Sequence, residues 1–163
     1  VRLQASVGVG LGTPACVADP DGGWRLYCHE YASSYYHIVS AHSADGLTWH
    51  REPGVRITQS LPGDDFGVYG PHVVRCSDGW VMVFAAWTAQ PAISGAIWAA
   101  WSADGLTWQR ASSPWLTPGP SYDGRVCSEP FLDLHSSHID LYYEGCDPQR
   151  NYRLCRARAT LRR

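Results

Sequence analysis

Apolar runs of strand length alternate with short polar turns along the whole chain, and the alternation occurs in three successive units. Each unit opens at a proline, Pro14, Pro71 or Pro130, and continues with an apolar run, a polar turn and a run rich in aromatic and aliphatic residues. A further run follows in every unit: "YYHIVSAHS", "GAIWAAWS" and "YRLCRARA". No convincing amphipathic helix interrupts the series, so the pattern predicts an all-β protein.

The heptapeptide "SADGLTW" occurs twice, at Ser43–Trp49 and at Ser102–Trp108, each time at the end of the third run of a unit. Asp and Gly are the residues that a tight turn requires, so "ADG" predicts a turn that leads into a fourth, outer strand. Trp49 and Trp108 are expected to begin that strand and to pack between neighbouring sheets. The third unit ends without this element. We interpret the heptapeptide as structural and place no chemistry on it.

Four short strands per unit, at a spacing of roughly 40–60 residues, are typical of a β-propeller in which each unit is one blade. We predict a single domain, residues 1–163, built from three four-stranded antiparallel units. The expected bounds are about 12–57 for blade 1, about 66–117 for blade 2 and about 125–163 for blade 3, with 1–7 as a candidate outer strand of blade 3. The inner strands are expected to begin near Thr13, Gly70 and Glu129.

Charge and composition exclude several classes of partner. The formal net charge is −2 and no long basic or acidic run occurs, so neither nucleic acid nor a membrane is an expected partner. No apolar run approaches the ~20 residues that a membrane-spanning helix needs. The 8 Trp and 9 Tyr residues are more informative, because such side chains are often recruited to ligand-binding surfaces. The compartment stays open between cytoplasm and secretion.

The 6 cysteines lack the CxxC spacing of a zinc site. Cys146 and Cys155 flank the segment "CDPQRNYRLC", where two outcomes are open: a disulfide across a hairpin, or two small buried thiols. No metal ligand and no cofactor is predicted.

The proline-led inner strand, the "DG" turn before an aromatic residue and the pattern S-x-D-G-L-T-W together resemble the five-bladed β-propeller glycoside hydrolases, the superfamily of the arabinanases, xylosidases and invertases. The resemblance implies a carbohydrate ligand at the mouth of a central channel and acid/base chemistry by carboxylates. The segment "SEP" is similar to the family's segment that bears the general acid, which implies Glu129 as the acid. The family's base is an Asp on the first inner strand, where this chain has Thr13, or Ala15 one step on.

When the units are aligned at their prolines, inner-strand positions near the expected channel mouth correspond to one another. The aligned sets are Thr13, Gly70 and Glu129, and Ala15, His72 and Phe131. Glycoside hydrolysis requires two carboxylates, about 5 Å apart for retention or roughly 6.5–9.5 Å apart for inversion. Glu129 and Asp65 are the predicted catalytic residues. On the second strands, His29, Ala85 and Glu144 occupy corresponding positions. The predicted substrate-binding residues are His72, Tyr69, Thr13, His29, Asp123 and Phe131.

The predicted function is that of a glycoside-hydrolase-like propeller acting on a carbohydrate. Two alternatives stay open: a sugar-binding propeller without turnover, and an enzyme that uses acid/base chemistry on another small molecule. Two of the predicted site residues could instead have a purely structural role. Glu129 could form an ion pair with Arg125, and His72 could be a hydrogen-bonded histidine of the inner strand.

Three blades are fewer than the ~4–8 that close a propeller. Open blade faces would leave apolar surface in water, so we predict a homodimer in which two chains form one six-bladed ring. The alternative is that the chain is a fragment of a longer protein.

Overall fold

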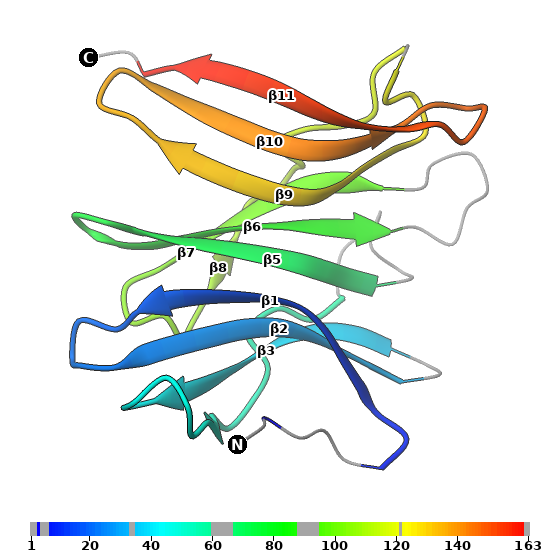
Figure 1. Cartoon of the computed structure of the whole chain (residues 1–163). Helices are drawn as coiled ribbons and strands as arrows, with labels where there is room; N and C mark the ends of the chain where they lie inside the picture. Colours follow the sequence, from blue (N-terminus) through cyan, green and yellow to red (C-terminus); the bar gives the residue numbers. More distant parts are fainter. Residues whose placement is uncertain are drawn as a thin grey trace.

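The computed structural model describes residues 3, 7–32, 35–59, 67–87, 95–120 and 122–161, and every helix or strand assigned within these ranges is a β-strand. The strands form three antiparallel sheets that lie one beside the next in chain order (Figure 1). The prediction of an all-β fold built from propeller-type blades is therefore confirmed. The part of the chain described here contains no helix that could cross a membrane.

Each sheet is a meander of consecutive strands, and we call the sheets blades 1, 2 and 3. Blade 1 contains β1 (Gly10–Ala18), β2 (Trp24–Ala32), β3 (Tyr35–Ser43) and β4 (His50–Arg51). Blade 2 contains β5 (Gly67–Cys76), β6 (Gly79–Trp87), β7 (Ala96–Ser102) and β8 (Gln109–Arg110). Blade 3 contains β9 (Val126–Leu134), β10 (His138–Cys146) and β11 (Tyr152–Thr160). The inner strand β5 contacts both other inner strands, β1 and β9.

The outer strand predicted for blade 3 falls mostly outside the described residues. Of residues 1–7, only Leu3 and Val7 are described, and neither lies in a strand. Completion of blade 3 by this segment therefore stays a prediction.

The inner strands begin at Gly10, Gly67 and Val126, three residues before the expected starts. Thr13, Gly70 and Glu129 instead lie inside them, each at a shift in strand register. All three have left-handed backbone conformations, with φ of 43°, 58° and 45° respectively. The following proline has no N–H to donate to the strand ladder, so a bulge forms there. For Thr13 and Glu129 this conformation is strained, and such strain concentrates at functional positions.

The two copies of the heptapeptide fold in the same way. Asp45 Oδ1 accepts hydrogen bonds from the backbone N–H groups of Leu47 at 2.8 Å and Thr48 at 2.7 Å. Asp104 Oδ1 accepts the equivalent bonds from Leu106 and Thr107 at 2.8 and 2.7 Å. In each copy the preceding serine hydroxyl accepts a hydrogen bond from the glycine N–H. The repeated letters therefore encode a side-chain-capped turn, as the sequence predicts.

The apolar core lies in two clusters, one between each pair of neighbouring blades. The cluster between blades 1 and 2 includes Tyr27, Ile38, Met82, Phe84 and Trp98. The cluster between blades 2 and 3 includes Val83, Ile97, Leu132, Leu141 and Tyr143. Blade 2 contributes to both because it is covered on both faces, which explains the nearly continuous apolar run "WVMVFAAW" in β6.

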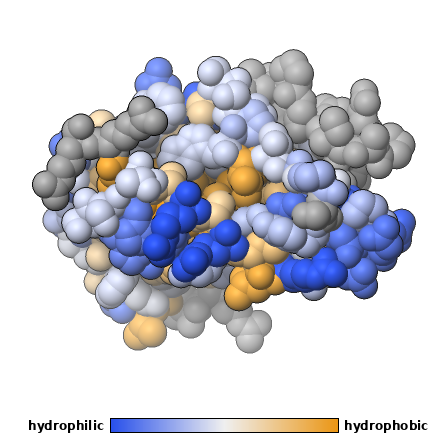
Figure 2. Space-filling model, turned by 90° about the horizontal axis from the view of Figure 1, so that it is seen from above, coloured by the Kyte–Doolittle hydropathy of each residue, from blue (hydrophilic) through white to orange (hydrophobic). Residues whose placement is uncertain are grey.

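The end of the blade array at blade 3 carries exposed apolar side chains. Tyr152 and Leu154 on β11 are 61% and 85% exposed. Figure 2, which views the molecule from above in the orientation of Figure 1, shows apolar surface exposed between strongly hydrophilic side chains. Such surface is typical of a site for a further ligand, blade or partner.

All six cysteines are free thiols. The register of the β10–β11 hairpin pairs Cys146 with Tyr152 and Cys155 with Tyr143, so the two cysteines do not face each other. Of the two outcomes left open by the sequence, the structure has the buried thiols.

Candidate functional site

A cavity of about 680 Å³ opens between the first residues of the inner strands and receives side chains from all three blades. A second cavity of about 480 Å³ lies farther along the same strands. Thr13 and Glu129 line both cavities, because each sits at the bulge between them. Volumes of this size are typical of small-molecule sites.

Glu129 is exposed to the cavity and approaches the neighbouring blade. A Cβ atom at position 70 would lie 3.1 Å from Glu129 Oε2, so the glycine there leaves room for the carboxyl group. Surrounding protein atoms raise the pKa of Glu129 by desolvation, and the nearby Glu144 carboxylate raises it further. Both causes favour the protonated form, which is the form a general acid requires.

Glu144 lines the same cavity from β10. Its Oε1 atom accepts a hydrogen bond of 3.1 Å from the Ser128 hydroxyl, which lies directly opposite on β9. The cavity therefore contains two carboxyl groups on adjacent strands, one of which is hydrogen-bonded and one of which has a raised pKa. Alignment of the repeats places Glu144 at the position of His29, but alignment alone does not show that its side chain enters the cavity.

Thr13 and His29 form the blade 1 side of the cavity. The Thr13 hydroxyl and His29 Nδ1 lie 2.7 Å apart, at hydrogen-bond distance. Burial lowers the pKa of His29, so the ring is held in its neutral form and is suited to hydrogen bonding with a neutral ligand.

Aromatic rings form most of the remaining wall. Tyr31 and Tyr36 are stacked, with ring centroids 5.3 Å apart and planes 14° apart. Tyr69 packs on Trp87 with a centroid distance of 4.1 Å. The Tyr69 hydroxyl is buried close to Ser128 and Trp87, and burial raises its pKa. Tyr31, Tyr36 and Trp87 were not among the predicted site residues, because apolar and aromatic strand positions do not reveal which face they occupy.

His72 and Phe131 belong to the second cavity. Their ring centroids are 4.2 Å apart, and the backbone N–H of Leu132 donates a hydrogen bond of 3.1 Å to His72 Nδ1. Since Nδ1 is an acceptor, the proton of the neutral ring lies on Nε2. Burial lowers the pKa of His72, which favours this neutral form.

The structure separates Asp123 from the other predicted residues. Asp123 is buried within blade 3, where it accepts hydrogen bonds from the Tyr143 hydroxyl at 2.8 Å and the Gly119 N–H at 3.2 Å. It lines neither cavity described above. Asp65 lies outside the described residues, so its position relative to Glu129 stays a prediction. Thr13, His29, Tyr69 and Glu129 share the first cavity, and His72 and Phe131 join Glu129 in the second.

No family model and no curated protein matches the sequence. Solved structures do match the fold. A thermostable family-43 glycoside hydrolase is 18% identical with a TM-score of 0.76, and the match covers 97% of this chain and 56% of that chain. A family 117 glycoside hydrolase from the marine bacterium Zobellia galactanivorans is 14% identical with a TM-score of 0.76, covering 94% and 53% of the two chains.

An N-acetylgalactosamine deacetylase from F. plautii, solved with blood group B trisaccharide, is 18% identical with a TM-score of 0.67, covering 92% of this chain and 50% of that chain. The chain thus spans about half the length of these three proteins. Together the likenesses confirm that the chain has the blade fold of propeller-type glycoside hydrolases. One of these structures is a deacetylase and not a glycoside hydrolase, so the fold alone does not define the chemistry.

Proposed function

We propose that the protein acts on a carbohydrate in a glycoside-hydrolase-like reaction, with Glu129 as the general acid. The observation that carries this proposal is the position of Glu129: its carboxyl group has a raised pKa and faces a cavity that also contains Glu144. A protonated carboxyl group can donate a proton to the oxygen of a glycosidic bond as that bond breaks.

The aromatic wall supports a sugar as the ligand. Tyr31, Tyr36, Tyr69 and Trp87 present rings to the cavity, and aromatic faces stack well against the C–H-bearing faces of sugar rings. His29, Ser128 and the Tyr69 hydroxyl supply polar atoms for sugar hydroxyl groups.

We propose Glu144 as the second carboxylate of the reaction. It lines the same cavity, and the hydrogen bond that the Ser128 hydroxyl donates to Glu144 Oε1 holds this carboxyl group in position. Asp65 is the other candidate for this role, on the grounds of the repeat alignment.

A second function, sugar binding without turnover, is favoured by one observation. Thr13 and Gly70 occupy the positions equivalent to Glu129 in blades 1 and 2, and neither carries a carboxyl group. Where the resemblance implies an aspartate base, the chain therefore has a hydroxyl group. In this function Glu129 and Glu144 would hold sugar hydroxyl groups by hydrogen bonds.

A panel of aryl glycosides distinguishes the two functions. Under the catalytic proposal, Glu129→Gln lowers the rate of release of the aryl group by about 10²–10⁴-fold, and Glu144→Gln or Asp65→Asn identifies the partner carboxylate by a comparable loss. Asp78→Asn, which alters an exposed turn carboxylate, is the matched control and should leave the rate unchanged. Sugar binding without release of the aryl group, followed through the intrinsic tryptophan fluorescence of the chain, would instead establish the binding function.

A further inference from the structure

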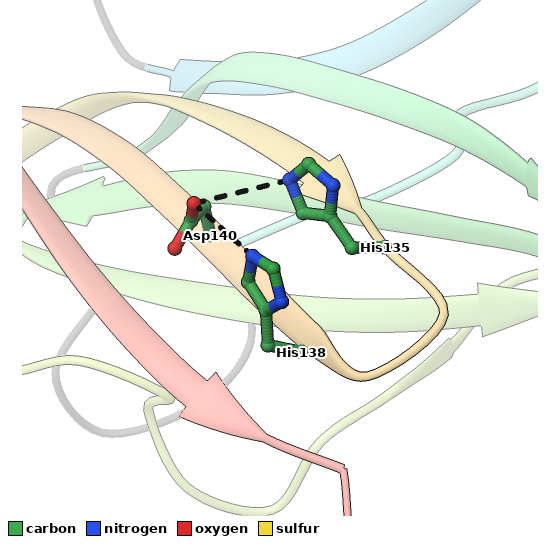
Figure 3. Close-up of side chains that lie close together, drawn as sticks. All are labelled: His135, His138 and Asp140. Atoms are coloured by element: carbon green, nitrogen blue, oxygen red, sulfur yellow. Dashed lines mark ion pairs between the residues drawn. The ribbon is translucent and has the colours of Figure 1, made fainter.

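Two histidines and an aspartate converge at the hairpin that joins β9 to β10 (Figure 3). His135 lies in the turn, and His138 and Asp140 lie two residues apart on β10, so they share one face of the strand. In Figure 3 both imidazole rings direct a nitrogen atom toward the Asp140 carboxylate. The cluster follows the end of β9, whereas Glu129 lies near the beginning of that strand, so it is separate from the cavity described above.

The distances within the cluster are close to those of a metal site. Asp140 Oδ2 lies 3.6 Å from His138 Nε2 and 3.8 Å from His135 Nε2. One donor atom from each of the three residues falls within 4.8 Å of the others. Ligand atoms bound to zinc at 2.0–2.1 Å in tetrahedral geometry lie roughly 3.3 Å apart, so small side-chain rotations would bring all three into coordination.

Neighbouring groups already hold the ligands in orientation. Arg158 on β11 donates two hydrogen bonds of 2.7 Å to the Asp140 carboxylate, which keeps that nearly buried group ionised and fixed in place. Ser137 Oγ lies 3.0 Å from His138 Nδ1, and in the tautomer whose Nδ1–H donates to this oxygen the lone pair is on Nε2, the nitrogen that faces the carboxylate. Outer hydrogen bonds of this kind select the tautomer of metal-binding histidines.

A second carboxylate lies beside the cluster. Asp133 lies directly opposite Asp140 in the strand register, and its Oδ2 atom is 3.1 Å from His135 Nε2. Two carboxylates therefore flank the histidines, and the guanidinium groups of Arg158 and Arg156 both interact electrostatically with Asp140. The two imidazole rings are stacked, with centroids 4.2 Å apart and planes 15° apart.

We propose that His135 Nε2, His138 Nε2 and Asp140 Oδ2 bind one divalent transition-metal ion of the zinc class. Imidazole nitrogen together with carboxylate oxygen suits Zn²⁺, Ni²⁺ or Co²⁺ rather than Ca²⁺ or Mg²⁺, which prefer ligand sets made only of oxygen. Three protein ligands leave the fourth tetrahedral position to water, as in zinc sites with three protein ligands and one open position. This site does not depend on the proposed carbohydrate function.

Calorimetric titration of the purified chain with ZnCl₂ tests the proposal, and absorption spectroscopy with CoCl₂ identifies the ligands. We expect one ion per chain and the visible absorption of four-coordinate Co²⁺, without the near-ultraviolet band that a thiolate ligand such as exposed Cys16 would produce. His135→Ala and His138→Ala should each weaken binding by at least about 10-fold, because each removes one of three ligands.

His42→Ala and His50→Ala are matched controls, since both histidines lie in blade 1 and outside the cluster. They should leave affinity and stoichiometry unchanged. Circular dichroism of the metal-free hairpin variants should match that of the wild type, because His135 is 40% exposed and His138 is 22% exposed at its side chain. Absence of binding by the folded wild-type chain, or wild-type affinity in both hairpin variants, would overturn the proposal.

Discussion

The Tyr27 hydroxyl in blade 1 donates a hydrogen bond of 2.8 Å to the backbone carbonyl of Gly105 in blade 2. The same carbonyl accepts a bond of 3.0 Å from Trp108 Nε1, and the Tyr27 and Trp108 rings meet edge to face at 5.7 Å. The second heptapeptide turn is therefore not only a connection within blade 2. It also fastens blade 2 to blade 1 by hydrogen bonds, beside the apolar cluster between the two blades.

Replacement of Tyr27 by Phe should lower the free energy of unfolding by about 0.5–1.5 kcal/mol, the usual net value of one hydrogen bond. The loss stays moderate because Trp108 still donates to the Gly105 carbonyl. Urea denaturation measures the change. Tyr122→Phe is the control, since Tyr122 is 50% exposed and should have little effect. A neutral Tyr27→Phe result would show that the hydroxyl does not fasten the blades.

The two copies of the heptapeptide offer a matched pair of substitutions. Asp45 and Asp104 cap identical turns, but only the second turn is docked on the preceding blade, where Arg25 donates to the Asp104 carbonyl and Arg56 to the Leu106 carbonyl. Asp104→Ala should therefore lower the urea midpoint more than Asp45→Ala. Equal midpoints for the two variants would mean that docking between blades contributes little stability.

The raised pKa of Glu129 predicts a specific dependence of stability on pH. Between the ordinary glutamate pKa of about 4.3 and the raised folded-state value, the folded chain binds more protons at this site than the unfolded chain. This group therefore makes the free energy of unfolding fall as pH rises through that window. Glu129→Gln should be more stable than the wild type at neutral pH, and the difference should disappear below pH of about 4.

Thermal unfolding across a pH series measures this effect. Glu144→Gln serves as a cross-check, because removal of its negative charge lowers the pKa of Glu129 and should weaken the dependence. A Glu129→Gln variant with the same pH profile as the wild type would contradict the assignment of Glu129 as a group protonated above its usual range.

Equivalent positions on the three blades predict where a second copy would bind. Tyr27, Val83 and Tyr142 pair across the strands with Ala15, His72 and Phe131, the three aligned inner residues. Tyr27 and Val83 are buried against the following blade, while Tyr142 at the end of the series is only half-buried. We predict that blade 1 of a second copy covers Tyr142, and that residues 43–49 of that copy contact Tyr142 as the 102–108 turn contacts Tyr27.

Sedimentation equilibrium tests this homodimer, which would close a six-bladed ring. Leu47 in the first turn is 69% exposed, in keeping with a turn that still lacks a neighbour. Tyr142→Arg should dissociate the dimer, whereas Tyr122→Arg should not. A folded monomer of 18.0 kDa at micromolar concentration would exclude the ring.

The sequence alone determined the repeat, the β-class and the turns. The spacing of Pro14, Pro71 and Pro130 and the two heptapeptides was enough, because turn chemistry and strand alternation are local properties that neighbouring residues encode. The same repeat also led to Glu129 as the position of greatest interest. Placement of its carboxyl group in a cavity then required the neighbouring blade.

Tertiary structure decided the rest. Each inner strand begins three residues before the predicted start, and the bulge lies after those three residues. The bulge sets which side chains enter the cavity. The side chains of Glu144, Tyr36 and Trp87 line the first cavity, which the sequence did not predict. Asp123, a predicted site residue, is instead buried in blade 3 and accepts a hydrogen bond from Tyr143. The cluster in the segment "HSSHID" depends on the β9–β10 register, which places Asp133 opposite Asp140. Which face a residue occupies depends on strand register and on the adjacent blade, and neither is encoded within a short window of sequence.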